Sequence, residues 1–142
     1  MRFERAVEIE PQDPDARFQL GRLDRREGRY AEAEKNLLAV IARDPRFSHH
    51  EIWREFGANY LDAKLYEDAR LALERFAAQR AHDPEGLFYL GETLLALQRV
   101  DEAKARFKEA IEAADTMPPY RQHEVKEWRK RAARRLYWSW FS

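Results

Sequence analysis

The sequence predicts an all-α fold in which pairs of helices repeat along the chain and a separate helix follows the last pair. Three observations support this prediction. A pattern of glycine, alanine and large apolar residues recurs at intervals of 36 and 34 residues. No segment alternates apolar and polar residues as a half-buried strand does. A Pro-Pro pair at 118–119 separates a basic C-terminal segment from the repeats.

The recurring pattern is centred on Gly21, Gly57 and Gly91, each of which follows a large apolar residue. An alanine comes twelve residues after each glycine, and further apolar residues follow that alanine at the fourth and seventh positions. This spacing places the alanine and the apolar residues on one face of a helix. A small residue at a fixed place among larger ones indicates a close helix crossing, and a two-helix repeat of about 34 residues is typical of a solenoid.

Residues that begin helices mark the element boundaries. Asp13 and Asp83, each followed by proline, are typical N-caps, and the segment 48–51 (Ser-His-His-Glu) has the pattern of a capping box. The turn between the two helices of each repeat contains, in order, Gly28, Lys64 and Gln98. Helices are predicted at about 14–27, 31–43, 49–63, 67–81, 85–97 and 101–115.

The residues at the recurring positions support a family resemblance. The second repeat carries Trp53, Phe56, Gly57, Tyr60 and Ala69. The third carries Leu87, Leu90, Gly91, Leu94, Ala103, Phe107 and Ala110, and the first carries Leu20, Gly21, Ala33, Leu37 and Pro45. In this order they resemble the tetratricopeptide repeat, with its consensus W-x2-L-G-x2-Y followed by A, F, A and P. The first repeat departs from this consensus at Arg17 and Asp24, so its first helix is expected to pack loosely.

The resemblance implies a right-handed α-α superhelix over residues 1–117, with three helix-turn-helix repeats at about 14–47, 48–83 and 84–117. Residues 1–12 match the second half of a repeat through Phe3, Ala6 and Pro11. This half repeat is expected either to belong to a longer array or to form a lone leading helix.

The last segment, 118–142, is predicted to form a capping helix over about 120–137. One face of this helix carries Val125, Trp128, Ala132 and Leu136, which suits a terminal helix that covers the last apolar surface of a solenoid. The segment has seven Lys and Arg against two Glu, a formal charge of +5. Because the whole chain sums to zero, residues 1–117 carry −5. The segment ends in the aromatic residues Tyr137, Trp138, Trp140 and Phe141.

The composition limits the chemistry that the chain can perform. The 142 residues are 44% hydrophobic and 37% charged, as in a folded domain with a charged surface. The absence of cysteine excludes disulfides, thiolate zinc sites and cysteine nucleophiles. The four histidines lack metal-binding spacing, and neither a serine hydrolase motif nor a phosphate-binding glycine loop occurs. The chain is therefore expected not to be an enzyme and to use no metal or cofactor.

The resemblance also implies where a partner binds, because the first helix of each such repeat lines a concave groove. The expected groove residues are Phe18, Arg22, Arg25, Arg26, Arg54, Glu55, Phe88, Tyr89 and Glu92. Among these residues, Phe18, Phe88 and Tyr89 are expected to be exposed aromatics, the residue type that binding hot spots favour. An acidic chaperone tail is not expected as the ligand, because Glu55 and Glu85 stand where related repeats use basic and amide residues.

The predicted function is that of a protein–protein interaction scaffold, which holds a peptide or helix of a partner in this groove. Two alternatives remain. The tail residues Trp138, Trp140 and Phe141 are candidates for self-association, and the basic terminal helix is a candidate for attachment to a membrane surface. Nucleic acid is not the expected partner, because the whole chain has no net positive charge. Neither a signal peptide nor a stretch of about 18 apolar residues occurs, so a cytoplasmic location is expected.

Overall fold

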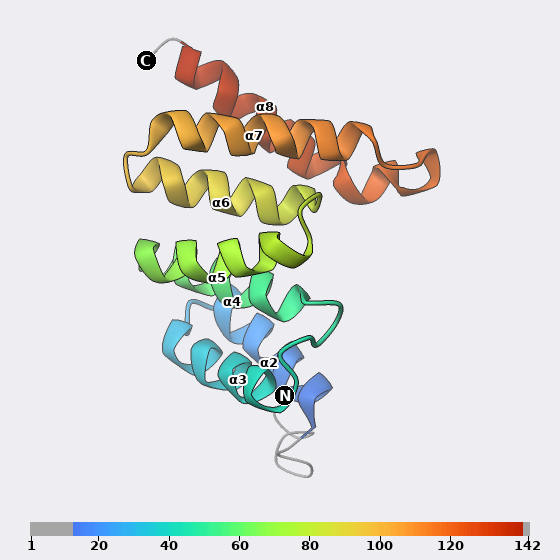
Figure 1. Cartoon of the computed structure of the whole chain (residues 1–142). Helices are drawn as coiled ribbons and strands as arrows, with labels where there is room; N and C mark the ends of the chain where they lie inside the picture. Colours follow the sequence, from blue (N-terminus) through green and yellow to red (C-terminus); the bar gives the residue numbers. More distant parts are fainter. Residues whose placement is uncertain (1–12, 141–142) are drawn as a thin grey trace. The chain divides into compact units, whose positions relative to one another are not determined.

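The computed structural model describes the backbone of residues 13–140 and the side chains of residues 13–137 (Figure 1). All regular elements in this range are helical, as the sequence predicts. The predicted half repeat at 1–12 and the tail residue Phe141 lie outside the described residues. The chain divides into two compact units, unit 1 up to Ala72 and unit 2 from Leu73 onward, and the division falls within helix α5 (Tyr66–Gln79).

Unit 1 contains α2 (Pro14–Arg26), α3 (Tyr30–Arg43), α4 (Glu51–Asp62) and the first half of α5. Its core is formed by the apolar faces of these helices, with Leu37 and Ile52 fully buried. Gly21 allows α2 and α3 to approach closely, because a Cβ atom at this position would lie 2.8 Å from the Leu37 side chain. The glycine and leucine of the repeat pattern therefore form the crossing point that their spacing predicts.

Unit 2 contains the second half of α5, then α6 (Pro84–Ala96), α7 (Val100–Asp115), a 3-10 turn (Pro119–Arg121) and α8 (Gln122–Trp140). The pair α6 and α7 repeats the arrangement of α2 and α3. A Cβ atom at Gly91 would lie 2.5 Å from a ring carbon of Phe107, so that only glycine fits at this crossing.

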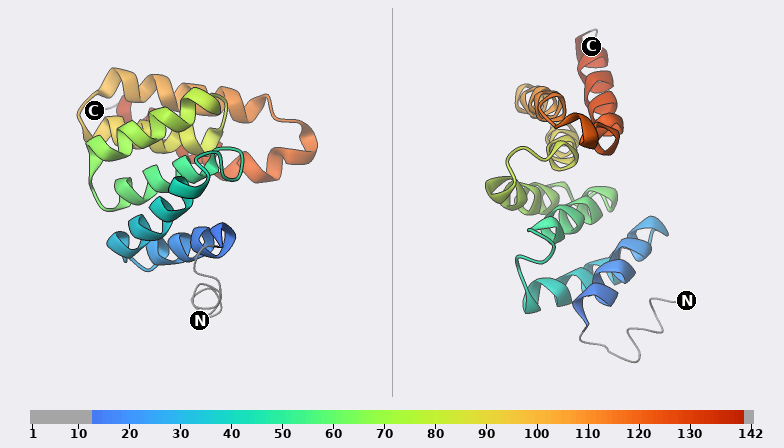
Figure 2. Two further views of the ribbon diagram at one scale, coloured as in Figure 1. Left: turned by 60° about the horizontal axis from the view of Figure 1, so that its bottom comes forward. Right: turned by 90° about the vertical axis from the view of Figure 1, so that its right-hand side faces the viewer.

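The terminal helix α8 packs against α6 and α7, and Figure 2 shows it beside this pair. Val125 and Ala132 are buried in the contact, as the predicted apolar face requires. The Gln122 side chain donates hydrogen bonds to the carbonyl oxygens of Ala114 and Met117, 3.1 and 2.6 Å away, and so fastens the start of α8 to the end of α7. The helix runs to Trp140, a little further than predicted.

Two of the three predicted N-caps are confirmed and one is wrong. Asp13 accepts a hydrogen bond from the backbone N–H of Asp15, and Asp83 accepts one from that of Gly86. Ser48 does not cap a helix, because its hydroxyl donates to the Glu51 carboxylate over 2.8 Å. Residues 48–50 instead have positive φ angles of 55°, 51° and 72°, which turn the chain before α4 begins at Glu51.

The predicted turn positions inside the repeats share one backbone conformation. Gly28, Lys64 and Gln98 have φ angles of 79°, 65° and 62°, all in the left-handed region. This region is where a helix commonly ends, and glycine adopts it without strain. Only the first repeat has the glycine, so the other two repeats accept some backbone strain at the same point.

Candidate partner-binding surface

Five of the predicted groove residues lie together in unit 1, on α2 and α4. This set, called here the α2/α4 surface, comprises Arg22, Arg25, Arg26, Arg54 and Glu55. The two helices contact one another within the unit. Arg25 and Arg26 follow Arg22 by three and four residues, so the helical repeat brings these three arginines to one side of α2.

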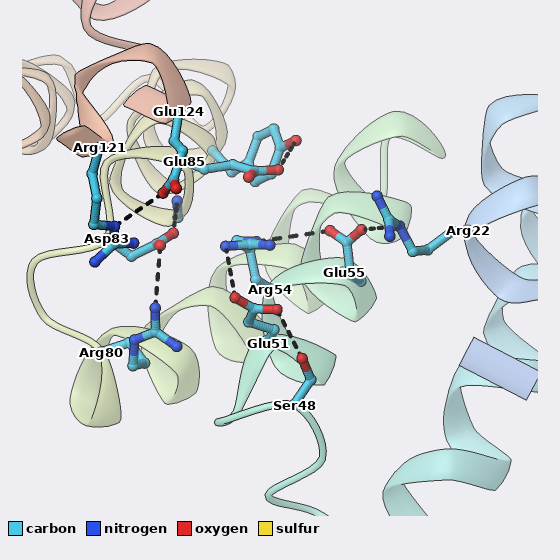
Figure 3. Close-up of polar contacts among 12 residues, drawn as sticks. Arg22, Ser48, Glu51, Arg54, Glu55, Arg80, Asp83, Glu85, Arg121 and Glu124 are labelled. Carbon is cyan, nitrogen blue, oxygen red and sulfur yellow. Dashed lines mark hydrogen bonds and ion pairs between the residues drawn. The ribbon is translucent and has the colours of Figure 1, made fainter. Parts of the chain in front are cut away.

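Glu55 is the centre of the α2/α4 surface. It is only 2% exposed, and its Oε1 atom lies 3.0 Å from Arg22 Nε, as Figure 3 shows. The same atom lies 3.8 Å from Arg25 Nη2. On the other side, its Oε2 atom lies 3.8 Å from Arg54 Nε. A buried carboxylate is tolerated when cations surround it. Glu55 is therefore an internal counterion that holds three arginines around one point.

The outer part of the same surface is also ordered by ion pairs. Arg25 Nη1 lies 3.0 Å from Asp62 Oδ2, and Arg54 Nη1 lies 3.8 Å from Glu51 Oε2 (Figure 3). Arg26 is exposed and makes no hydrogen bond or ion pair with the described part of the chain. Four arginines thus face three carboxylates, which leaves one net positive charge on a surface whose other charges are paired.

Two buried acceptor atoms beneath this surface accept no hydrogen bond from any described residue. They are Glu55 Oε2 and Asn59 Oδ1. The Asn59 amide instead donates to the carbonyl oxygen of Tyr30 over 3.0 Å, which ties α4 to the start of α3. Unsatisfied buried acceptors lower stability. Unit 1 therefore retains polar groups with incomplete hydrogen bonding beneath this surface.

The expectation that Phe18 is an exposed groove aromatic is wrong. Phe18 is 6% exposed and belongs to the core of unit 1, where its ring centroid lies 5.1 Å from that of Phe47. The Arg22 guanidinium lies over the Phe18 ring, 5.7 Å from its centroid. The sequence did not reveal this burial, because Phe47 comes from the irregular segment between α3 and α4.

The expectation that Phe88 is exposed is also wrong, because α8 covers the first helix of the third repeat. Phe88 is 8% exposed, and its ring centroid lies 5.8 Å from that of Trp128, which also stacks edge-on against Tyr89 at 5.3 Å. Arg135 binds both carboxylate oxygens of Glu92, with Nη2 at 2.9 Å from Oε2. Phe88, Tyr89 and Glu92 thus hold the terminal helix in unit 2.

The predicted self-association residues are described only in part. The backbone of Trp138 and Trp140 lies in the last turn of α8. Their side chains, and the whole of Phe141, lie outside the described residues. Their role in self-association stays a prediction.

The expected loose packing of the first repeat is wrong, because a polar network replaces the missing apolar residues. Asp24 is buried and accepts hydrogen bonds from Arg29 Nη2 at 2.9 Å and from Asn36 Nδ2 at 2.9 Å. Arg17 Nη1 donates to the Asn36 Oδ1 atom over 2.8 Å. The sequence did not predict this network, although the polar residues at both departures from the consensus, Arg17 and Asp24, indicated that polar pairing replaces apolar contact there.

Burial and ion pairing shift the pKa of three described groups. Burial, together with a hydrogen bond to Glu34, raises the pKa of the Tyr60 hydroxyl above its usual value, so this hydroxyl keeps its proton. The hydrogen bond with Arg129 lowers the pKa of the Asp115 carboxyl and raises that of the Arg129 guanidinium. The shifts of Asp115 and Arg129 favour the ion pair between them.

Two hollows open on the helix surfaces. One, of about 550 Å³, lies within unit 2 and is lined by the end of α5 together with α6 and α7. The other, of about 370 Å³, lies within unit 1 beside the Asp24 network. In the described residues, no three His, Asp or Glu side chains converge as a metal site requires. None of the helices described is long and apolar enough to cross a bilayer.

The fold and its repeated crossing points define a helical-repeat protein. Two models of the tetratricopeptide repeat match the chain, one over residues 1–58 and the other over residues 60–128. The chain therefore belongs to the tetratricopeptide-repeat family. A comparison with curated proteins found no match.

Several solved structures share this fold. A type III secretion system complex from Aeromonas hydrophila is 22% identical over 87% of this chain and 78% of that chain, with a TM-score of 0.76. MamA is 15% identical over 99% of this chain and 88% of that chain, with a TM-score of 0.69. SycD, the type III secretion translocator chaperone of Yersinia enterocolitica, is 20% identical over 86% of this chain and 92% of that chain, with a TM-score of 0.68. At these identities the likeness shows the fold alone.

Proposed function

We propose that this chain is a non-enzymatic scaffold that holds a peptide or helix of a partner protein against the α2/α4 surface. A protein–protein interaction role is supported by the tetratricopeptide repeats and by similar structures that are complexes or chaperones. The single observation that carries the finer proposal is the arginine cluster around buried Glu55. It presents fixed donors that need little ordering when a partner binds.

The chemistry of the surface suggests a ligand of mixed charge. Arg26 is exposed and unengaged by the described residues, and the Arg22 side chain is 41% exposed although its Nε atom is paired. Both can meet a carboxylate or a backbone carbonyl of a partner. Glu51 and Asp62, at the edge of the surface, can meet a cation.

A free acidic tail is a poorer fit. Glu55 already occupies the point on which three arginines converge, so a second carboxylate would be repelled from that point. The proposal is also restricted to unit 1. In unit 2 the equivalent residues Phe88, Tyr89 and Glu92 are occupied by α8.

Site-specific photo-crosslinking tests the proposal. A photoreactive phenylalanine analogue replaces Gln19, two turns before Arg26 on the same side of α2, in one variant and Leu38, which is exposed on α3, in another. A partner that crosslinks at position 19 and not at position 38 is then purified and titrated against the unmodified chain. We expect Arg26→Glu to weaken binding about tenfold or more, as for a hot-spot arginine, and Lys35→Glu to leave it unchanged. Equal crosslinking at both positions, or equal effects of both substitutions, would contradict the proposal.

A further inference from the structure

The cations of α8 and of the 3-10 turn before it fall into two groups with different surroundings. Arg129 and Arg135 bind Asp115 and Glu92 of the preceding helices, while Arg121 and Arg131 bind carboxylates of their own segment. Lys126, Lys130 and Arg134 are exposed, and they make no hydrogen bond or ion pair with the described part of the chain. These three residues are called here the outer stripe.

The outer stripe is a continuous row on one face of α8. Its members are spaced four residues apart, so they lie above one another along about 12 Å of helix. The helical register places this row opposite the buried residues Val125 and Ala132. Tyr137, three residues beyond Arg134, continues the row and is exposed.

A row of like charges destabilises a helix slightly, and the rest of the chain shows how such charges are usually neutralised. Arg70 and Arg106 each bind a glutamate three residues away on their own helix, and Arg99 binds Glu102 across the start of α7. The outer stripe has no such neighbours, because Glu124 and Glu127 are engaged by Arg121 and Arg131. This face therefore presents three uncompensated positive charges.

We infer that the outer stripe is a docking face for an anionic phospholipid surface, an activity beyond the proposed partner binding. Two of its three cations are lysines, which protein–protein interfaces tend to exclude but which are typical of polybasic contacts with acidic lipids. The same helix continues in sequence into Trp138, Trp140 and Phe141, the residue types that enter the headgroup region.

The apolar face of α8 takes no part in this contact. It is used against α6 and α7, where Trp128 stacks on Phe88. Attachment therefore differs from that of an amphipathic helix that buries its own apolar side in the bilayer. The stripe lies along the membrane plane, and the charge of the lipid headgroups supplies the attraction.

Vesicle co-sedimentation tests this inference. The full chain is mixed with vesicles of equal parts phosphatidylglycerol and phosphatidylcholine, and separately with vesicles of phosphatidylcholine alone. We expect binding to the first only, and weaker binding as salt is raised. Replacing Lys126, Lys130 and Arg134 by glutamine should weaken binding about fivefold for each residue and roughly a hundredfold for all three.

A matched control removes the same charge elsewhere. Lys35, Lys64 and Lys108 are exposed on other elements, and their triple replacement by glutamine should leave binding nearly unchanged. Equal losses in the two triple variants would overturn the inference, as would equal binding to both kinds of vesicle. A different result would also overturn the inference. In that result, neither the wild-type chain nor the outer-stripe variant binds vesicles, and the variant loses a binding to single-stranded RNA that the wild type has.

Discussion

The first helices of the first and third repeats have the same place in the repeat but different surroundings. In unit 1, α2 presents Arg22 and Arg26 to solvent and packs Phe18 inward. In unit 2, α6 has Phe88 and Glu92 at the positions of Phe18 and Arg22, and α8 covers both through Trp128 and Arg135. The same repeat position can therefore have different roles in different repeats. In unit 2 the added helix α8 covers α6, and in unit 1 the buried Glu55 carboxylate keeps α2 charged and accessible.

We expect the largest effect on the free energy of unfolding from weakening the packing of α8 on α6 in unit 2. Trp128→Ala deletes a ring that packs on Phe88 and Tyr89, and we expect it to lower the free energy of unfolding by about 3 kcal/mol, as for other large aromatic deletions. Urea denaturation measures this change. Tyr120→Ala is the control, because Tyr120 is exposed and its loss should change stability by less than about 0.5 kcal/mol. Equal effects of the two variants would mean that α8 is not held by Trp128.

The next effect concerns the counterion of unit 1. Glu55→Gln leaves three arginines around a neutral side chain, and we expect a loss of about 2 kcal/mol. This is less than for a fully buried pair, because the arginines reach solvent and keep other partners. Glu51→Gln, at the edge of the same surface, should cost less than about 1 kcal/mol. If Glu55→Gln stabilises the chain, the carboxylate is not the centre that orders the arginines.

Some of the contacts behind these effects were predicted from the sequence, and others were not. The glycines, the alanines and the apolar spacing predicted the helices, because each acts through neighbours in its own repeat. The exposure of Phe18 and Phe88 was mispredicted, because the covering rings of Phe47 and Trp128 come from outside the repeat positions. Pairing is similarly hard to predict from a sequence: one partner of Asp24 is Asn36, twelve residues away on another helix.

Substitutions at the turn positions test whether the turns of the two units are equivalent. Their expected effect on the free energy of unfolding is smaller. Lys64 in unit 1 and Gln98 in unit 2 have the left-handed conformation that Gly28 adopts freely. We expect Lys64→Gly and Gln98→Gly each to raise the free energy of unfolding by about 0.5 kcal/mol, and Gly28→Ala to lower it by about 1 kcal/mol. A Cβ atom at Gly28 meets nothing within 4 Å, so the conformational effect is isolated. Thermal melts of the three variants check these signs, and the reverse sign in any of them would contradict the shared turn.

The smallest effect is the acid sensitivity of the link between α7 and α8. The pKa of Asp115 is lowered in the folded chain by its hydrogen bond to Arg129, so this stabilisation is complete above the usual aspartate pKa of about 3.9. It is lost as the pH falls through the lowered value. The difference in unfolding free energy between the wild type and Asp115→Asn should therefore shrink in this acid range. A constant difference down to the lowest pH would show that the pair does not contribute.

The central claim is that a partner binds on the α2/α4 surface while the equivalent face of unit 2 stays closed. Arg22 and Arg26 of α2 and Glu55 of α4 report on the first region, and the Trp128 indole of α8 reports on the second. The most direct measurement is an NMR titration of the isotope-labelled chain with the partner segment identified by crosslinking. We expect shifts for Arg22, Arg26 and Glu55, with Trp128 unchanged. Shifts centred on Trp128, Phe88 and Tyr89, with α2 unaffected, would contradict it.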